Sequence, residues 1–145
     1  MNLADPVDVL SRTIYGEDRG GGREGMEAVA SVILNRAAHP RWWGTDVVSV
    51  CLKPAQFSCW NADDPNRAKI EAATGADPAF TIALSVADAA VTGRLLDPTD
   101  GADSYFAFGT PEPDWARGLV PTALIGGQRF YRVELPAPGV PSVSA

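Results

Sequence analysis

The chain has 145 residues, enough for one domain that buries about two-thirds of the surface exposed by the unfolded chain. Hydrophobic residues make up 46% and charged residues 21%, and no apolar run approaches the roughly 18 residues of a membrane span, so membrane insertion is not expected. The net charge of -6 provides no basic surface for nucleic acid. We therefore expect a monomer with one domain at residues 1–135 and a flexible, proline-rich tail at residues 136–145.

Five helices are predicted in the first two-thirds of the chain. Three of them begin at an Asp-Pro pair, in which Asp serves as N-cap and Pro occupies the first helical position. Three consecutive glycines at positions 20–22 predict a loop after the first helix, because glycine is costly inside helices and permits positive φ. The predicted helices cover residues 6–17, 23–38, 47–52, 65–73 and 78–92.

The pattern changes to β-prone runs in the last third. Residues 104–108, 123–125 and 129–133 are rich in aromatic and branched side chains, and the last two runs flank Gly126-Gly127, which is typical of a hairpin turn. Residues 56–61 read as a loop or a short strand. The predicted fold is therefore α+β, mainly helical, with a small β-hairpin or sheet near the C-terminus.

Few residues are available to bind a metal. Cys51 and Cys59 are eight residues apart, the chain has no Cys-x-x-Cys pair, and His39 is its single histidine. A zinc site is therefore poorly supplied, and we expect neither metal nor cofactor. The cysteines could pair if the loop between them turned back, but two free, buried thiols are favoured for a protein made in the cytosol.

Glu17 is the leading candidate for a catalytic acid. It stands three residues after Ile14 and seven after Leu10, so it projects from the apolar stripe that anchors the first helix. Partial burial disfavours the charged carboxylate and raises its pKa, as a general acid near neutral pH requires. The alternative is a helix-end glutamate paired with Arg19 or Arg36.

Four separated blocks carry recognisable motifs: IYGEDRG with EGMEAVASVILNR at residues 14–36, KPAQFSCWN at 53–61, WAR at 115–117 and IGGQRFY at 125–131. In this order they resemble the SleB-type cell-wall hydrolase family, which includes spore-cortex lytic enzymes and many phage lysins. The resemblance implies a lysozyme-like fold shared with lytic transglycosylases and places Glu17 on the family's catalytic glutamate. Its implied substrate is the peptidoglycan glycan strand of alternating N-acetylmuramic acid and N-acetylglucosamine.

The chain departs from this family at several positions. Gly21 stands where relatives commonly carry a second glutamate, and Gln128 and residues 103–105 lack histidines that many relatives have. These departures affect the expected substrate preference more than the identity of the acid.

A second carboxylate is harder to identify. A retaining or inverting glycosidase needs one as nucleophile or as base for water. Asp18 is adjacent to Glu17 and should point about 100° away around the helix, while Glu24 could fold back over the glycines or simply favour the N-terminus of the next helix. With two weak candidates, a lytic transglycosylase mechanism in which Glu17 acts alone becomes attractive.

A glycan groove needs aromatic platforms beside amide and hydroxyl groups. Trp42 and Trp43 either line such a groove or cover the edge of the core, and adjacent tryptophans at a helix end favour the second interpretation. Phe57 is assigned to the core. The expected substrate-binding residues are Gln56, Ser58, Trp60, Asn61 and Tyr105.

Two other classes of function compete with a glycosidase. A peptidoglycan amidase or peptidase would need zinc or a Cys-His pair, which His39 alone supplies poorly. The second competing class is a non-catalytic virion protein that binds the cell wall and has the same fold. Because the first residues lack the basic and apolar regions of a secretory signal, we expect a phage or prophage endolysin. It would wait in the bacterial host cytoplasm until a holin releases it to the wall or periplasm, or it would be carried by the virion.

Overall fold

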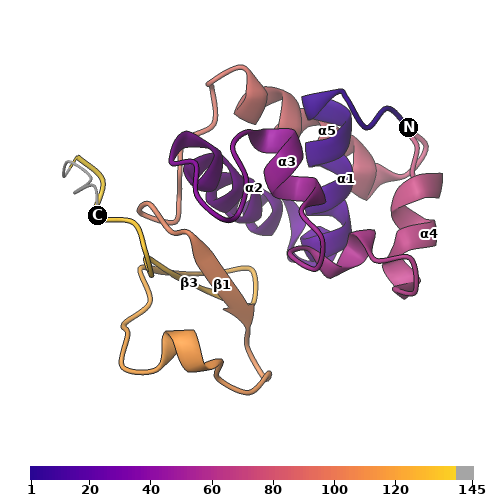
Figure 1. The fold of residues 1–145 in the computed structure, drawn as a ribbon. Coiled ribbons are helices and arrows are strands. Elements are labelled where there is room, and N and C mark those ends of the chain that lie inside the picture. Colours follow the sequence, from indigo (N-terminus) through magenta and orange to yellow (C-terminus); the bar gives the residue numbers. More distant parts are fainter. Residues whose placement is uncertain (140–145) are drawn as a thin grey trace.

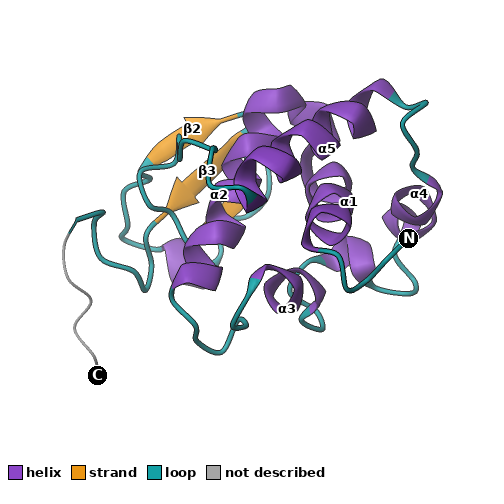
Figure 2. Cartoon of the chain, turned by 90° about the horizontal axis from the view of Figure 1, so that it is seen from above, coloured by secondary structure: helices purple, strands orange, loops and turns teal. Residues whose placement is uncertain are grey.

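The computed structural model describes residues 1–139 and has the predicted α+β architecture. In Figure 1 the helices form one body and a three-stranded antiparallel sheet packs beside it; Figure 2 shows the same arrangement from above. The helices are α1 (Pro6–Asp18), α2 (Gly22–Ala38), α3 (Val47–Leu52), α4 (Pro65–Ala72) and α5 (Pro78–Val91). The strands are β1 (Ser104–Ala107), β2 (Ala123–Ile125) and β3 (Gln128–Tyr131), and the 3-10 helices are η1 (Arg19–Gly21), η2 (Ser58–Trp60) and η3 (Asp114–Ala116).

The three Asp-Pro pairs begin helices as predicted. Asp5, Asp64 and Asp77 each accept a hydrogen bond from the backbone N–H two residues later, at 2.8 to 3.0 Å. Each cap satisfies one of the N–H groups left without a partner in the first turn of a helix, and the following proline lacks such a group. The starts of α1, α4 and α5 are therefore fixed by local sequence.

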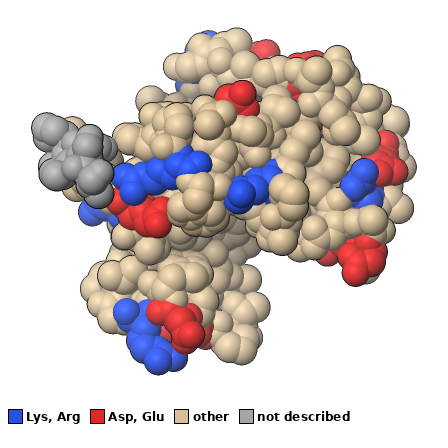
Figure 3. Space-filling model, in the orientation of Figure 1, with Lys and Arg blue, Asp and Glu red and all other residues tan. Residues whose placement is uncertain are grey.

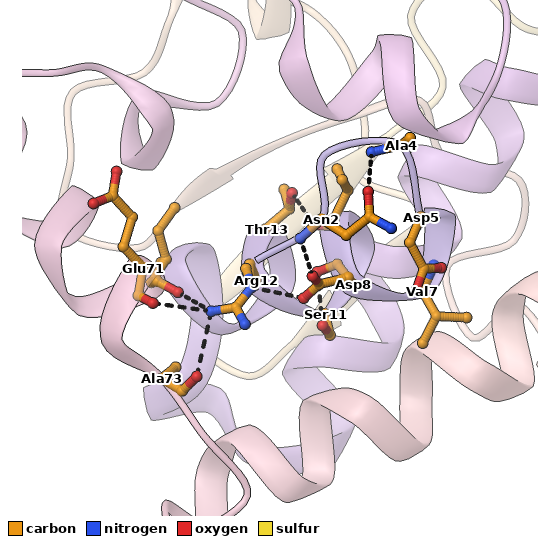
Figure 4. Close-up of polar contacts among 12 residues, drawn as sticks. Asn2, Ala4, Asp5, Val7, Asp8, Ser11, Arg12, Thr13, Glu71 and Ala73 are labelled. Carbon is orange, nitrogen blue, oxygen red and sulfur yellow. Dashed lines mark hydrogen bonds and ion pairs between the residues drawn. The ribbon is translucent and has the colours of Figure 1, made fainter.

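Arg12 joins α1 to the end of α4 (Figure 4). Its Nε donates to Asp8 Oδ1 at 2.7 Å, one turn earlier on α1. Its Nη1 donates to the carbonyls of Ile70 and Ala73, the latter at 3.3 Å. A buried guanidinium beside the free carbonyls of a helix C-terminus is favourable to the helix dipole. This network holds the helix that carries Glu17 against the rest of the helical body.

The main core lies among α1, α2 and α5. Its fully buried side chains include Leu10, Ile14, Val29 and Ile33, the apolar positions that recur at helical spacing. A smaller cluster of Ala28, Val32, Ala102 and Phe130 joins α2 to the sheet. Helix α2 therefore contributes side chains to both the main core and the smaller cluster, and it sets the position of the sheet relative to α1.

The sheet has the strand order β1-β3-β2. Strands β2 and β3 form the predicted hairpin about Gly126 and Gly127, whose φ values of 58° and 83° lie in the left-handed region that glycine adopts most easily. Strand β1 pairs with the other edge of β3, with Ser104 opposite Tyr131. This pairing brings Tyr105 to the side of the sheet that faces α1.

Two local predictions are wrong. The expected glycine loop after α1 is the 3-10 helix η1, and α2 begins at Gly22. Gly21 packs against the Asp18 carboxyl, where a Cβ would come within 2.6 Å of Oδ2. Within residues 56–61, where a loop or strand was expected, the chain forms η2. Residues 136–139 of the predicted tail lie near His39 and Gly101, and residues 140–145 lie outside the described part of the chain. No helix among the described residues is long and apolar enough to cross a membrane.

Candidate active site

A groove of about 360 Å³ separates the helices from the sheet. Its walls come from α1, α2, the segment at residues 42–57, strand β1, η3 and the two residues 133–134 after β3. Figure 3 shows this face of the molecule recessed between the helical body and the sheet, with mainly uncharged surface around the recess. Segments far apart in the sequence therefore converge on one groove.

Glu17 lines this groove from the last turn of α1. Its Oε1 accepts a hydrogen bond from the hydroxyl of Tyr105 at 2.9 Å. Burial raises the pKa of the Glu17 carboxyl, the interactions with Tyr105 and Cys59 partly oppose this, and the negative charge of Asp64 adds to it. Glu17 therefore holds its proton to higher pH than an ordinary glutamate, as a general acid must.

Tyr105 keeps its proton and acts as a donor. Burial, followed by the nearby charge of Glu17, raises the pKa of the Tyr105 hydroxyl well above its usual value. The ring packs at 5.5 Å from Phe130 on the central strand, which fixes its position. The sheet therefore supplies a rigid hydrogen-bond donor to a carboxyl that the helices supply.

Arg36 is the cation of the groove. Its Nε donates to the backbone carbonyl of Asp103 at 2.7 Å, and its guanidinium lies over the rings of Trp43 and Phe57. Desolvation lowers its pKa, against the opposite effects of Tyr105, Asp103 and Glu134. Arg19 instead donates to the side chain of Asn66 at 2.9 Å. Glu17 is thus held by Tyr105, and the alternative of a pair with Arg19 or Arg36 is wrong.

The family described as Cell Wall Hydrolase matches residues 20–131, which begin just after Glu17. The chain belongs to this cell wall hydrolase family. The catalytic domain of the germination-specific lytic transglycosylase SleB from Bacillus anthracis is similar to it, with 26% identity and a TM-score of 0.67 over 86% of this chain and 92% of that one. The catalytic domain of SleB from Bacillus cereus is also similar, with 26% identity and a TM-score of 0.64 over 86% and 88%. No curated protein matches the chain.

These similarities confirm the SleB-type family and the α+β fold predicted from the four sequence blocks. The four substrate-binding residues expected within the second block do not lie together in the structure of this wall hydrolase. Gln56 lines the groove, but its Nε2 is used to donate to the carbonyls of Trp43 and Val50, at 3.0 and 2.8 Å. Its position therefore braces the groove wall.

Ser58, Trp60 and Asn61 lie outside the groove lining. Ser58 is exposed, and Trp60 packs against the core with its Nε1 donating to Thr13 Oγ1 at 2.9 Å. The reason is that these residues form the 3-10 helix η2, which packs Trp60 against the helical body, instead of the expected loop or strand. Of the five predicted binding residues, Tyr105 alone contacts Glu17 through a side-chain hydrogen bond.

The structure brings neither predicted second carboxylate into the groove. Glu24 is exposed in the first turn of α2. Asp18 is buried on the adjacent side of α1, where a Cβ at Gly21 or Gly25 would crowd its carboxyl and Gly126 lies in contact with it. Burial and the nearby charge of Glu17 raise the pKa of Asp18 to about 6, although Gln128 and the Gly21 backbone oppose the shift. Asp18 is thus a structural neighbour of the acid.

The groove residues that the sequence did not assign to the site include Trp42, Trp115 and Glu134. The expectation for the tryptophan pair is right for Trp43, which is 1% exposed, and wrong for Trp42, which is 61% exposed and lines the groove. The two tryptophans follow α2 in the turn between Arg41 and Gly44, where one side chain faces the core and the next faces outward. Cys51 and Cys59 are both buried and free, and no cluster of three metal-binding side chains occurs within residues 1–139.

Proposed function

We propose that this wall hydrolase cleaves the glycan strand of bacterial peptidoglycan at the bond between N-acetylmuramic acid and N-acetylglucosamine, with Glu17 as general acid and base. The observation that carries the proposal is the buried Glu17 carboxyl, with its raised pKa, held at 2.9 Å by Tyr105 in a groove between the helices and the sheet. The similar Bacillus anthracis domain is described as a lytic transglycosylase, which supports the same chemistry here.

The reaction needs one carboxyl that changes role. Protonated Glu17 gives its proton to the glycosidic oxygen, and the bond from that oxygen to C1 of the muramoyl sugar breaks. The 6-hydroxyl of the same sugar then attacks C1 and forms a 1,6-anhydro ring. The Glu17 carboxylate accepts the proton of that hydroxyl, so the enzyme returns to its starting state without consuming water.

Tyr105 suits both halves of this cycle. Its hydroxyl stabilises the Glu17 carboxylate when the proton has left, and burial favours the protonated acid before the reaction. A carboxyl with these opposing influences can give up and regain a proton within one catalytic cycle. The aromatic rings of Trp42 and Trp115 along the groove suit the apolar faces of sugar rings.

Digestion of purified peptidoglycan tests the proposal. Wild-type protein should release muropeptides with 1,6-anhydro ends, identified by mass spectrometry, and Glu17→Gln should release none. Retained activity in Glu17→Gln would contradict the assignment of the acid. Release of free stem peptides by an EDTA-sensitive reaction would show an amidase or peptidase instead.

A muramidase is the second candidate, and the observation that favours it is Glu134 in the same groove. A second carboxylate could activate water or form a glycosyl intermediate. Products with only reducing ends, together with loss of activity in Glu134→Gln, would establish this hydrolytic reaction. The role as a phage or prophage endolysin, released by a holin or carried in the virion, stays a prediction.

A further inference from the structure

Trp42 is an exposed aromatic side chain with a fixed orientation. It is 61% exposed, lines the groove, and donates from Nε1 to both carboxylate oxygens of Glu134, at 3.2 and 3.0 Å. Its ring lies at 5.5 Å from the buried ring of Trp43, at an angle of 55°. An indole with so much exposed surface adds little to the core, so its ordered position calls for another explanation.

Glu134 is itself held by a buried anchor. The Asp103 carboxylate is fully buried and accepts the backbone N–H groups of Val133, Glu134 and Leu135 at 2.9 to 3.1 Å. Three successive N–H groups around one anion fix the direction of the chain after β3. Asp103 therefore fixes the backbone from which the Glu134 side chain reaches Trp42.

The groove wall formed by Trp42 and Glu134 lies next to Glu17, the proposed catalytic acid. Arg36 lines the same groove as Glu17, Trp42 and Glu134, and the charges of Tyr105 and Glu134 both raise its pKa against desolvation. Val133 and Glu134 follow the segment that matches the family, which ends at Tyr131. The wall is thus built partly by a segment outside the matched part of the domain.

We propose that Trp42 and Glu134 form a binding subsite for one N-acetylhexosamine ring of the glycan strand, beside the position of bond cleavage. The exposed indole face receives the apolar face of the ring. Glu134 orients the indole and, because an ionised carboxylate accepts about four hydrogen bonds, has capacity left for a sugar hydroxyl or acetamido N–H. Asp103 acts as a positioning residue. This inference rests on the proposed function, because it assigns a subsite to the same groove.

The subsite can be tested separately from catalysis by binding. In the Glu17→Gln protein, tetra-N-acetylchitotetraose is titrated by calorimetry, and Trp42→Ala added to that protein should weaken binding about tenfold. Trp42→Phe, which keeps a ring and loses the N–H donor, should give an intermediate loss. Leu124→Ala is the matched control, since Leu124 is 62% exposed and lies outside the groove lining.

Kinetics on solubilised glycan strands provide the second readout. Trp42→Ala and Glu134→Gln should raise KM about tenfold and about threefold while kcat stays within about twofold, with melting temperatures close to wild type. Unchanged binding and KM in both variants would overturn the subsite. A collapse of kcat in Glu134→Gln would overturn it too, by making Glu134 catalytic. Trp42-dependent oligosaccharide binding by a protein that leaves peptidoglycan intact would instead contradict the proposed function and keep the subsite.

Discussion

The two sides of the end of α1 carry adjacent carboxyls with opposite surroundings. Glu17 faces a groove and receives a hydrogen bond from Tyr105, whereas Asp18 faces a wall of glycines, and its Oδ2 is buried without a hydrogen-bond partner among the described residues. Burial raises the pKa of both groups. A raised pKa alone therefore does not identify a catalytic acid here, and access to substrate together with a matched donor does.

The largest expected difference between the two sides is in catalysis. Glu17→Gln removes the proton that the leaving oxygen needs and should lower kcat by about 1000-fold. Asp18→Asn should keep activity within about threefold, because its carboxyl does not line the groove. Initial rates of peptidoglycan clearing measure both. Equal losses in the two variants would mean that the pair acts as one catalytic unit.

The glycine wall around Asp18 should tolerate no methyl group. A Cβ at Gly25 would overlap Asp18 Oδ2, so Gly25→Ala should lower the free energy of unfolding by about 1–3 kcal/mol. Alanine is otherwise favoured over glycine in a helix by about 1 kcal/mol, so Gly25→Ala should stabilise an Asp18→Ala protein in which the obstructing carboxyl is gone.

Urea unfolding of the wild type, the two single variants and the double variant gives the coupling free energy between positions 18 and 25. Gly20→Ala is the control, since nothing lies within 4 Å of a Cβ there. Destabilisation of similar size in both backgrounds would show that the carboxyl is not what Gly25 accommodates.

The comparison also shows what the sequence could predict. The Asp-Pro caps and the Gly126-Gly127 turn are local signals, and they located three helix starts and the hairpin correctly. Helical phase placed Glu17 on the buried side and Asp18 about 100° away. The glycines at positions 20–22 were read as a loop because glycine content alone does not reveal that Gly21 packs against the Asp18 carboxyl.

The groove itself depended on contacts that no local pattern records. Tyr105 was predicted to bind substrate, but its hydrogen bond to Glu17 joins residues 88 positions apart. Glu134 reaches the groove because the buried Asp103 carboxylate turns the chain after β3, and neither residue belongs to a periodic segment. The motif at residues 56–61 was predicted to bind substrate, and this is wrong for Trp60, because η2 places its side chain away from the groove and against Thr13.

The stability of the Asp18 side should depend on pH. Its folded pKa of about 6 lies above the ordinary value of 3.8, so the wild-type protein should lose stability as pH rises from about 4 to about 6 and should lose no more from this group above that range. Asp18→Asn removes this loss and adds a donor beside the Gln128 amide, whose Oε1 is also buried without a partner among the described residues.

Relative to wild type, Asp18→Asn should therefore gain about 1–3 kcal/mol in the free energy of unfolding at pH 7, and much less at pH 4. Chemical denaturation at both values measures the difference. A gain that is the same at pH 4 and pH 7 would show that ionisation of Asp18 is not its source.

The smallest expected effect concerns the donor on the Glu17 side. Tyr105→Phe keeps the ring packed on Phe130 and removes the hydroxyl that holds the pKa of Glu17 down against desolvation. The pKa of Glu17 should then rise further, so the alkaline limb of the pH–kcat profile should move to higher pH. Maximal kcat should fall several-fold, because the carboxylate formed after proton transfer loses its donor. A profile that falls in height without moving would mean that Tyr105 positions substrate rather than tuning Glu17, and the contrast with Asp18 would then rest on access to the groove alone.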